Sequence, residues 1–246
     1  TLAQNAGQTF RLAGVISQPD KPSGRGRKFK SNPIAIRAKE HQLPLLQPQK
    51  PDDSLNQWVR QNEVELILVM AYGHILRKTL LELPRRGCVN LHASLLPKYR
   101  GAAPIQAALA CRETITGVSL MKMVPEMDAG PVADVEQVPI NFEWTSVELS
   151  TALAEAAVSL IQRNLHGILD GTAEYSPQDD SQATFSCKLT REHSWLDFNE
   201  PAEVLHARMR ALYPWPGSQC LHADTCLKVA QPTLPDTHDS LSQSAT

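Results

Sequence analysis

The stretch VELILVM at residues 64–70 decides the fold class, because it is the clearest buried strand in the sequence. Apart from Glu65 these residues are all apolar, so the run shows no alternation between a buried and an exposed face. Continuous apolar strands of this kind are typical of parallel sheets that helices cover on both faces. The stretch therefore predicts an α/β protein built on a parallel sheet.

Helices and strands are expected to alternate on both sides of this run. We expect further strands at residues 10–17, 43–46, 87–91, 117–124 and 132–140. We expect helices at residues 33–41, 53–62, 76–83, 103–111 and 145–169. This rhythm predicts a doubly wound, Rossmann-like, mostly parallel sheet. In such sheets ligands bind beyond the carboxyl ends of the strands, where loops lead into helices.

The chain is expected to divide at a polar segment, because the composition changes at residues 172–190 (TAEYSPQDDSQATFSCKLT). A polar stretch of this kind is typical of a linker. After it we expect a helix at 200–212, a rigid turn, and a strand at 226–230. The predicted organisation is a catalytic domain at 1–171, a linker at 172–190 and the start of a second domain at 191–246, which has too little apolar material to close a core by itself.

Composition and charge exclude several classes of protein. The 246 residues are 42% hydrophobic and 20% charged, which is typical of a globular protein. A net charge of −2 excludes a protein that is basic all over, although it permits a local basic patch. The sequence has no apolar run of transmembrane length, so we expect no membrane association. Five scattered cysteines indicate reduced thiols in a cytoplasm rather than a disulfide framework.

Polar residues with chemical potential follow two of the predicted strands. Asn90 and His92 stand two apart at the carboxyl end of the strand near 87–91, where both can donate a hydrogen bond and polarise a carbonyl. Asp128 follows the strand at 117–124 and is expected beside His92, where a carboxylate would orient the imidazolium and accept a proton. The alternative is an ordinary polar histidine and an ordinary turn aspartate.

The stretch KPSGRGRKFK at residues 21–30 places five cationic side chains in ten residues. Basic runs are often solvated surface loops, but arginines between glycines can also pair with phosphates. Other chemistry is not supported, because the sequence lacks a G-x-G-x-x-G motif after a strand, a P-loop and a nucleophile elbow.

The stretch NLHASLLPKYRGAAPIQ at residues 90–106 resembles the signature of the folate-dependent formyltransferases. Shorter blocks in the same order extend the resemblance: SQPD at 17–20, GRGRK at 24–28, AYG at 71–73, TGV at 116–118, DAG at 128–130 and PWP at 214–216. The resemblance implies that Asn90, His92 and Asp128 are catalytic and that no metal is required. It also implies folate contacts at the turn formed by Ser94, Leu95, Leu96 and Pro97.

Within this family the chain is most similar to the members that formylate methionyl initiator tRNA in translation initiation. That similarity implies 10-formyltetrahydrofolate as the co-substrate and contacts to the tRNA at Arg25, Arg27 and Lys28. It further implies a monomer in a bacterial-type cytoplasm or an organelle. Two alternatives stay open: a related enzyme that uses water or a small amine as acceptor, and an inactive fragment that binds folate or nothing.

The family pattern also predicts that the chain is truncated. A first strand of the sheet should precede Thr1, and the C-terminal β-barrel of the OB-like type should continue beyond Val229. Neighbours of a missing central strand would expose backbone groups that the full fold pairs, at about 1–3 kcal/mol for each buried group left unpaired. We therefore expect this chain to be poorly stable and weakly active. A sharp cooperative transition at high temperature in circular dichroism melting would contradict this expectation.

Overall fold

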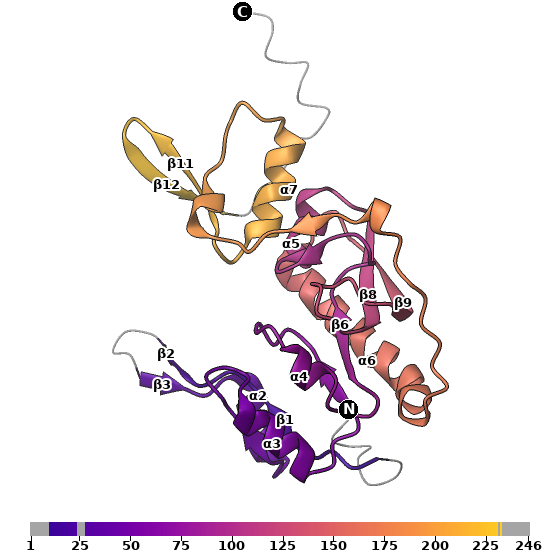
Figure 1. Cartoon of the computed structure of the whole chain (residues 1–246). Coiled ribbons are helices and arrows are strands. Elements are labelled where there is room, and N and C mark those ends of the chain that lie inside the picture. Colours follow the sequence, from indigo (N-terminus) through magenta and orange to yellow (C-terminus); the bar gives the residue numbers. More distant parts are fainter. Residues whose placement is uncertain (1–9, 24–27, 231, 233–246) are drawn as a thin grey trace, which may run out of the picture. The chain divides into compact units, whose positions relative to one another are not determined.

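The computed structural model describes the backbone of residues 10–23, 28–230 and 232 (Figure 1). Its described residues form two compact units, each made of three stretches of the chain. The first unit takes its residues from Thr1–His92, Leu120–Asp134 and Ile161–Pro177, and the second from Ala93–Ser119, Val135–Leu160 and Gln178–Thr246. Because the chain crosses between the units several times, neither unit is a single continuous segment.

The first unit contains most of the alternating helices and strands that the sequence predicts. Its elements are β1 (Val15–Ile16), β2 (Lys21–Ser23), β3 (Lys28–Lys30), α2 (Pro33–Glu40), β4 (Leu45–Leu46), α3 (Asp53–Gln61), β5 (Ile67–Val69), α4 (Lys78–Leu81) and β6 (Cys88–His92). The pairs β1–β4 and β5–β6 are both parallel. The parallel α/β architecture predicted from the sequence is therefore confirmed.

A capping side chain determines where helix α2 begins. The Asn32 side chain accepts a hydrogen bond from the Ala35 amide at 2.9 Å, and Pro33 follows it at the first helical position of α2. The strand predicted at residues 64–70 is shorter in the structure, where β5 begins only at Ile67. The amide of Val64 instead donates to the carbonyl of Val59 and completes the end of α3.

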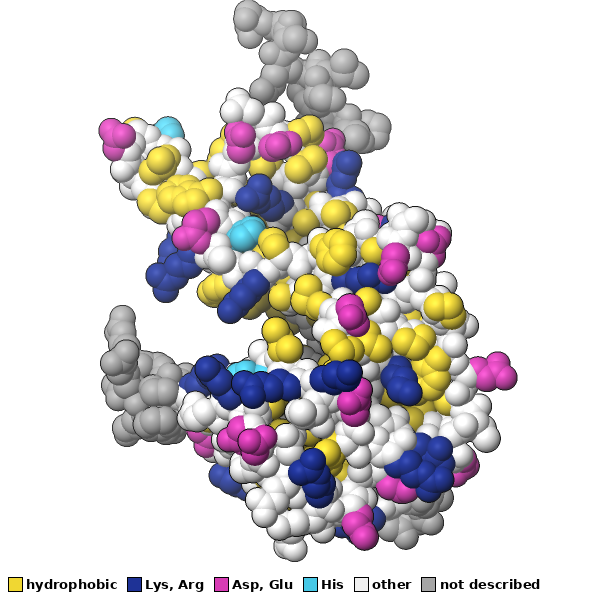
Figure 2. Space-filling model, viewed as in Figure 1, with side chains coloured by type: hydrophobic (Ala, Val, Ile, Leu, Met, Phe, Trp, Pro, Cys, Tyr) yellow, Lys and Arg dark blue, Asp and Glu magenta, His cyan; other side chains and the backbone are white. Residues whose placement is uncertain are grey.

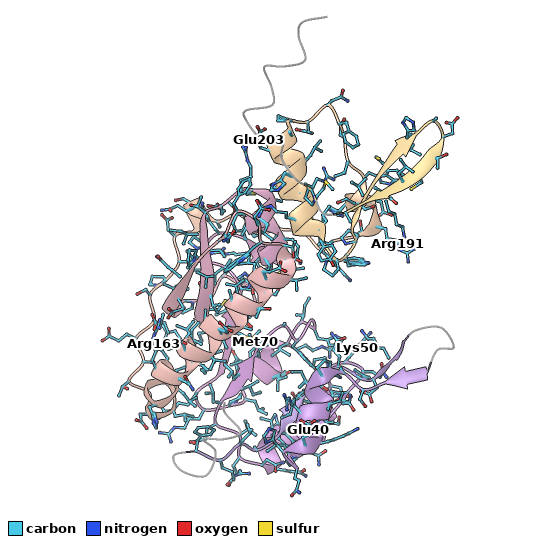
Figure 3. The ribbon with its side chains drawn as sticks, turned by 180° about the vertical axis from the view of Figure 1, so that it is seen from behind. Glu40, Lys50, Met70, Arg163, Arg191 and Glu203 are labelled. Atoms are coloured by element: carbon cyan, nitrogen blue, oxygen red, sulfur yellow. The ribbon has the colours of Figure 1, made fainter. Side chains whose placement is uncertain are left out.

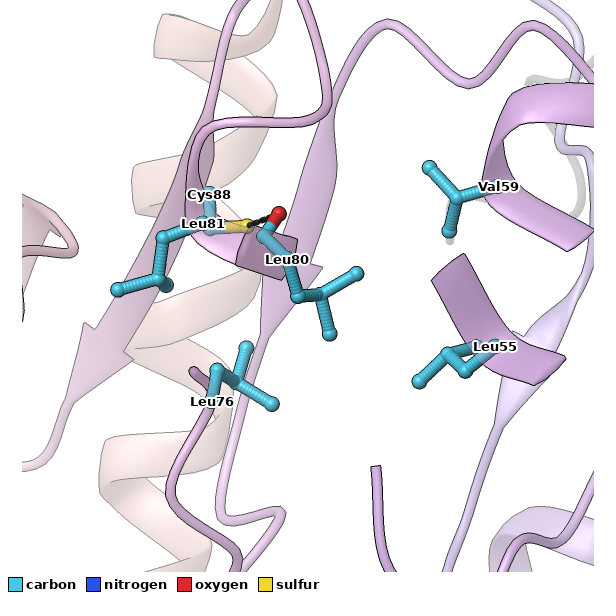
Figure 4. Close-up of a cluster of buried hydrophobic side chains, with 6 residues drawn as sticks. All are labelled: Leu55, Val59, Leu76, Leu80, Leu81 and Cys88. Carbon is cyan, nitrogen blue, oxygen red and sulfur yellow. Dashed lines mark hydrogen bonds between the residues drawn. The ribbon is translucent and has the colours of Figure 1, made fainter. Parts of the chain in front are cut away.

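A cluster of apolar side chains forms the core of the first unit (Figure 4). Its buried members come from α3, from α4 with the residue Leu76 before it, and from β6: Leu55, Val59, Leu76, Leu80, Leu81 and Cys88. The thiol of Cys88 lies 3.8 Å from the carbonyl oxygen of Leu80, and burial raises its pKa to about 12. Cys88 is thus an unreactive core residue that fixes β6 against the helices.

Strands β8 (Ile115–Lys122) and β9 (Val132–Pro139) run through both units in a four-stranded sheet with the order β5-β6-β8-β9. At one end the Lys122 amide donates to the Pro131 carbonyl at 2.9 Å, and at the other Ile140 donates to Thr114 at 2.8 Å, so the two strands are antiparallel. The turn between them needs Gly130, because a Cβ there would lie 1.8 Å from the Lys122 carbonyl oxygen. This turn carries the segment that includes Asp128.

The long helix α6 (Ser146–Asp170) follows β9 and matches the prediction closely. It ends at Gly171, whose φ of 80° is a left-handed conformation that favours glycine. The remaining elements lie in the second unit: β7 (Arg100–Gly101), α5 (Pro104–Ala110), the 3₁₀ turns Asp180–Gln182 and Arg191–Ser194, β10 (Phe185–Ser186), α7 (Ala202–Leu212), β11 (Ser218–His222) and β12 (Thr225–Val229).

Two features of the second unit differ from the sequence-based prediction. β11 and β12 form an antiparallel hairpin, although only the second strand was predicted. Their two-residue turn has Ala223 and Asp224 at positive φ. Because the usual Asn-Gly pair is absent, the sequence did not indicate a hairpin here. The segment at 172–190 was predicted as a linker, yet it contains β10, which pairs in parallel with β7.

Candidate active site

Strand β6 presents Asn90 and His92 on one face, because alternate residues of a strand point the same way. The intervening Leu91 and the preceding Val89 point to the opposite face and are buried. Asn90 lies opposite Val69 in the register with β5 and is partly exposed, whereas His92 is only 5% exposed. Both polar residues therefore stand at the end of β6, where the sequence placed them.

The structure brings Asp128 beside His92. Its carboxylate Oδ2 lies 3.7 Å from Nδ1 of the imidazole, and the Asp128 side chain is 17% exposed. This separation is longer than a tight hydrogen bond. Asp128 has a φ of 53°, a left-handed conformation that Asp and Asn tolerate better than most residues. The local fold thus places one carboxylate against one imidazole nitrogen.

The Ser94–Pro97 turn is held from inside by Ser119, which is fully buried. The Ser119 hydroxyl donates to the Ser94 carbonyl at 2.7 Å and accepts from the Leu96 amide at 3.0 Å. The Ser94 hydroxyl donates to the Lys98 carbonyl at 2.6 Å, so that it closes the turn. The apolar residues between Ser94 and Lys98 remain partly exposed, and the sequence had no local signal for the part played by Ser119.

A second set of contacts fixes the residues just after this turn. The Tyr99 hydroxyl donates to the Glu113 carboxylate at 2.6 Å, and the Lys98 ammonium lies 2.9 Å from the same oxygen. Burial, and then the hydrogen bond to Glu113, raise the pKa of Tyr99 well above its usual range. The Tyr99 hydroxyl and then Lys98 lower the pKa of Glu113, so the carboxylate stays charged at neutral pH.

Strands β2 and β3, on either side of the predicted tRNA contacts in the sequence, form an antiparallel pair from Lys21 with Lys30 to Ser23 with Lys28. Arg25 and Arg27 lie outside the described residues, and only the backbone of Lys28 is described. The base of the hairpin is anchored, because the carboxylate of Asp20 accepts hydrogen bonds from Gln47 and Ser31. These bonds, in that order, lower the pKa of Asp20.

One side chain joins the anchored base of the hairpin to the segment after β5. Gln18 donates from its amide to the carbonyl of Tyr72 at 2.9 Å. Met70, which follows β5, is half-exposed (Figure 3). Glycine is needed at Gly73, whose φ is 75° and where a Cβ would lie 2.8 Å from the Gln18 amide nitrogen. The AYG block of the sequence is therefore a tight turn at the carboxyl end of a strand.

Basic and acidic side chains are both distributed over the face seen in Figure 2, in keeping with a net charge of −2. Among the residues that the structure describes, no group of three or more His, Cys, Asp or Glu side chains could hold a metal ion. Within the same residues, no helix has the length and apolar character needed to cross a membrane.

We expect Ser119→Ala to loosen the Ser94–Pro97 turn, because it removes the one hydroxyl that bridges Ser94 and Leu96. Leaving a buried polar group without its partner costs about 1–3 kcal/mol, so the free energy of unfolding should fall by about that amount. Chemical denaturation measures this loss. The matched control is Ser150→Ala, whose exposed hydroxyl only bonds back to the Ser146 carbonyl within α6 and whose removal should cost little. Equal losses in the two variants would contradict a special role for Ser119.

Comparison with known proteins identifies the class that this fold and site define. Residues 2–165 match the family described as "Formyl transferase", and residues 188–244 match "Formyl transferase, C-terminal domain". The chain belongs to the formyl transferase family.

Its similar relatives in that family carry one more specific name. "Methionyl-tRNA formyltransferase" of Halorhodospira halophila is 42% identical over 219 residues, which are 89% of this chain and 71% of that protein. The protein of the same name from Deinococcus radiodurans is 43% identical over 227 residues, 92% of this chain and 71% of its own.

Solved structures of more distant proteins share the fold. A sugar N-formyltransferase from a Shewanella species superposes with a TM-score of 0.68 at 16% identity, covering 83% of this chain and 82% of that one. A 4-N formyltransferase from Francisella tularensis gives the same TM-score and identity, covering 82% and 83%. The Rossmann-like formyltransferase fold expected from the sequence is therefore confirmed.

Proposed function

We propose that the chain transfers the formyl group of 10-formyltetrahydrofolate to the amino group of methionyl initiator tRNA. The observation that carries the proposal is the imidazole of His92 with the Asp128 carboxylate 3.7 Å from its Nδ1, two residues beyond Asn90 on the same face of β6. The family of the chain and the names of its relatives support the same reaction. The proposal includes a monomer that works where initiator tRNA is charged, in a bacterial-type cytoplasm or an organelle.

The proposed chemistry begins with attack of the amino nitrogen on the formyl carbon. A new C–N bond forms, and the carbonyl electron pair moves to the formyl oxygen, which becomes an oxyanion. Asn90 donates to this oxygen from its side-chain amide, and His92 donates from Nε2, since Nδ1 is the nitrogen nearest Asp128. Donors that are fixed in place before the reaction stabilise such charge, and one of them is typically worth about 3–4 kcal/mol of barrier.

Asp128 completes the proposed reaction as a proton acceptor. The attacking nitrogen becomes cationic and must lose a proton, which passes to the Asp128 carboxylate directly or through a water molecule. The tetrahedral intermediate then collapses, the bond from the formyl carbon to N10 breaks, and N10 takes up a proton to give tetrahydrofolate. Because the charged carboxylate also faces His92, it favours the imidazole orientation in which the ring can donate to the oxyanion.

We propose that the Ser94–Pro97 turn binds the folate. Its apolar side chains, Leu95, Leu96 and Pro97, are partly exposed and offer a surface for an aromatic ring system. The hydroxyl of Ser94 is already bonded to the Lys98 carbonyl, so Ser94 contributes through the shape of the turn. Arg25, Arg27 and Lys28 are proposed to contact tRNA phosphates, because arginine side chains can pair with phosphate oxygens.

A formylation assay tests the proposed function directly. The chain is incubated with 10-formyltetrahydrofolate and one of three acceptors: methionyl-tRNA, free methionine, or water alone. The proposal predicts formyl-methionyl-tRNA together with one equivalent of tetrahydrofolate. Release of tetrahydrofolate at the same rate without tRNA would instead identify a hydrolase, and transfer to free methionine at the same rate would identify an enzyme for small amines.

Replacing both Arg25 and Arg27 with Ala should weaken tRNA binding and reduce its salt dependence. Each phosphate contact contributes about 0.7–0.9 to the slope of log K against log salt, so loss of two contacts should lower the slope by about 1.4–1.8. Filter binding of tRNA at several salt concentrations measures the slope. The control variant replaces Lys50 and Arg60, two exposed basic residues outside the 21–30 stretch, and should keep the original slope. Identical slopes in both variants would remove these arginines from the tRNA site.

A further inference from the structure

Part of the segment predicted as a linker is bound to the catalytic part of the sequence. Residues 178–186, here called the strap, lie against residues 97–103. This second stretch begins at Pro97, the last residue of the Ser94–Pro97 turn. The parallel pair β7–β10 joins Arg100 to Phe185 and Gly101 to Ser186. Backbone bonds extend this pairing, with the Arg100 amide donating to the Thr184 carbonyl at 2.9 Å. The strap is therefore an ordered structural element of the second unit.

Arg100 is the main side chain that holds the strap. It is only 5% exposed, and its guanidinium donates to the Gln178 side-chain oxygen at 3.0 and 2.8 Å and to the Asp180 carboxylate at 2.6 Å. Three bonds from one planar fork fix both the position and the orientation of the strap. A buried cation costs free energy when it has no partners. Arg100 and the strap are therefore expected to become ordered together.

Close backbone packing adds to these side-chain bonds at Gly101. Its φ is 118°, and a Cβ there would lie 2.3 Å from the Ser186 carbonyl oxygen. The hydroxyl of Ser186 accepts from the Ala103 amide at 3.1 Å, so the strap is fixed at both ends of β7. No side chain larger than that of glycine fits between the two segments at this point.

The strap also reaches the Ser94–Pro97 turn itself. The Thr184 amide donates to the carbonyl of Pro97 at 3.3 Å, and the Thr184 hydroxyl accepts from the Tyr99 amide at 2.9 Å. The turn is thus held from inside the sheet by Ser119 and along the chain by the strap. If the strap moved, the last residue of the turn would lose one of its backbone partners.

We propose that Arg100 is a positioning residue for folate binding: by tying the strap across residues 97–103, it fixes the Ser94–Pro97 turn in the shape that receives the co-substrate. This inference rests on the proposed function of that turn. It gives the segment between the two predicted domains a direct effect on the affinity for folate. It also makes Gln178 and Asp180 contributors to folate affinity, although they belong to the segment predicted as a linker.

The experiment measures tetrahydrofolate binding by calorimetry and the two KM values of formyl transfer for Arg100→Met, Arg100→Lys and the wild-type chain. For Arg100→Met we expect affinity for tetrahydrofolate to fall about tenfold, the size expected for lost charge-assisted bonds. KM for 10-formyltetrahydrofolate should rise by a similar factor, whereas KM for methionyl-tRNA should stay unchanged. Arg100→Lys keeps the positive charge but loses the planar guanidinium. Its affinity for tetrahydrofolate should therefore lie between those of the wild-type chain and Arg100→Met.

The matched control is Arg210→Met. Arg210 is as buried as Arg100 and donates to the Trp144 carbonyl at 2.8 Å, so its loss tests the general cost of removing a buried arginine from the second unit. The control should lose stability without a selective rise in KM for the folate. Equal folate affinity in Arg100→Met and wild type, or an equal loss in both Met variants, would overturn the inference.

A second variant keeps the inference testable if Arg100→Met does not fold. The double variant Gln178→Ala, Asp180→Ala removes the side-chain partners of Arg100 and leaves Arg100 in place. Folate affinity should again fall, and KM for methionyl-tRNA should stay unchanged. Unchanged affinity in this variant would contradict the positioning role. A wild-type chain that binds no tetrahydrofolate would instead refute the proposed function, so the two failures are distinguishable.

Discussion

The Asp128→Asn variant is expected to lose about 10²–10⁴ in kcat, because it removes the proposed proton acceptor while leaving the shape of the site intact. Asn is nearly the same size as Asp, and it also tolerates the left-handed conformation at φ 53° that this position requires. The loss should therefore appear in kcat and not in stability. Single-turnover formylation of methionyl-tRNA at saturating 10-formyltetrahydrofolate measures it.

The control for this variant is Asp134→Asn, which changes a carboxylate on β9 that accepts a hydrogen bond at 2.6 Å from Arg163 of α6, the arginine labelled in Figure 3. This substitution should reduce stability slightly and change kcat less than tenfold. If Asp128→Asn also changed kcat less than tenfold, the proton would have to leave the amine by another route.

The Asn90→Ala variant is expected to lower kcat by about 10²–10³, the usual effect of removing one oxyanion donor. Asn90 is itself partly exposed on β6, so its side chain contributes little to packing and the fold should be unchanged. Tetrahydrofolate affinity should stay close to that of wild type, because the donor acts on charge that develops only during the reaction.

Its control is Asn56→Ala in α3, which removes a more buried asparagine that contacts Asp53 at 3.4 Å. That variant should lose stability but not kcat. If turnover in Asn90→Ala equalled that of wild type, any formyl transfer observed could not come from this site. That result would favour the alternative of an inactive fragment.

Local patterns in the sequence predicted most of the elements that build the site. Helix α6 and strand β6 each carry a periodicity or an apolar run that short-range physics determines, and both lie within a few residues of their predicted bounds. A general rule of parallel sheets placed Asn90 and His92 at the carboxyl end of β6. The rule does not account for Asp128, because the bonds from Met123 to Cys88 and from Ser119 to Ser94 show that β8 runs antiparallel to β6. The 3.7 Å separation of Asp128 and His92 instead depends on the path of the loop after β8. Their catalytic roles stay predictions.

Contacts between residues far apart in the chain could not be predicted in the same way. Arg100 bonds to Asp180 across 80 positions, and Ser119 bonds to Ser94 across 25, so no local window of sequence contains both partners. The polar composition of residues 172–190 favoured a linker. Composition reflects which side chains face solvent, and it carries no information about the backbone pairing that β10 makes. The β11–β12 hairpin was missed because its turn residues lack the common signal.

The central claim is that three side chains act on one reacting group, and a double-mutant cycle between His92→Gln and Asp128→Asn tests it most directly. The measurement is the single-turnover rate of formyl transfer to methionyl-tRNA in wild type, both single variants and the double variant. Residues that act as a unit are strongly non-additive, so the double variant should be about as slow as the slower single variant. Two losses that simply multiply would mean that the imidazole and the carboxylate work independently, and would contradict the account.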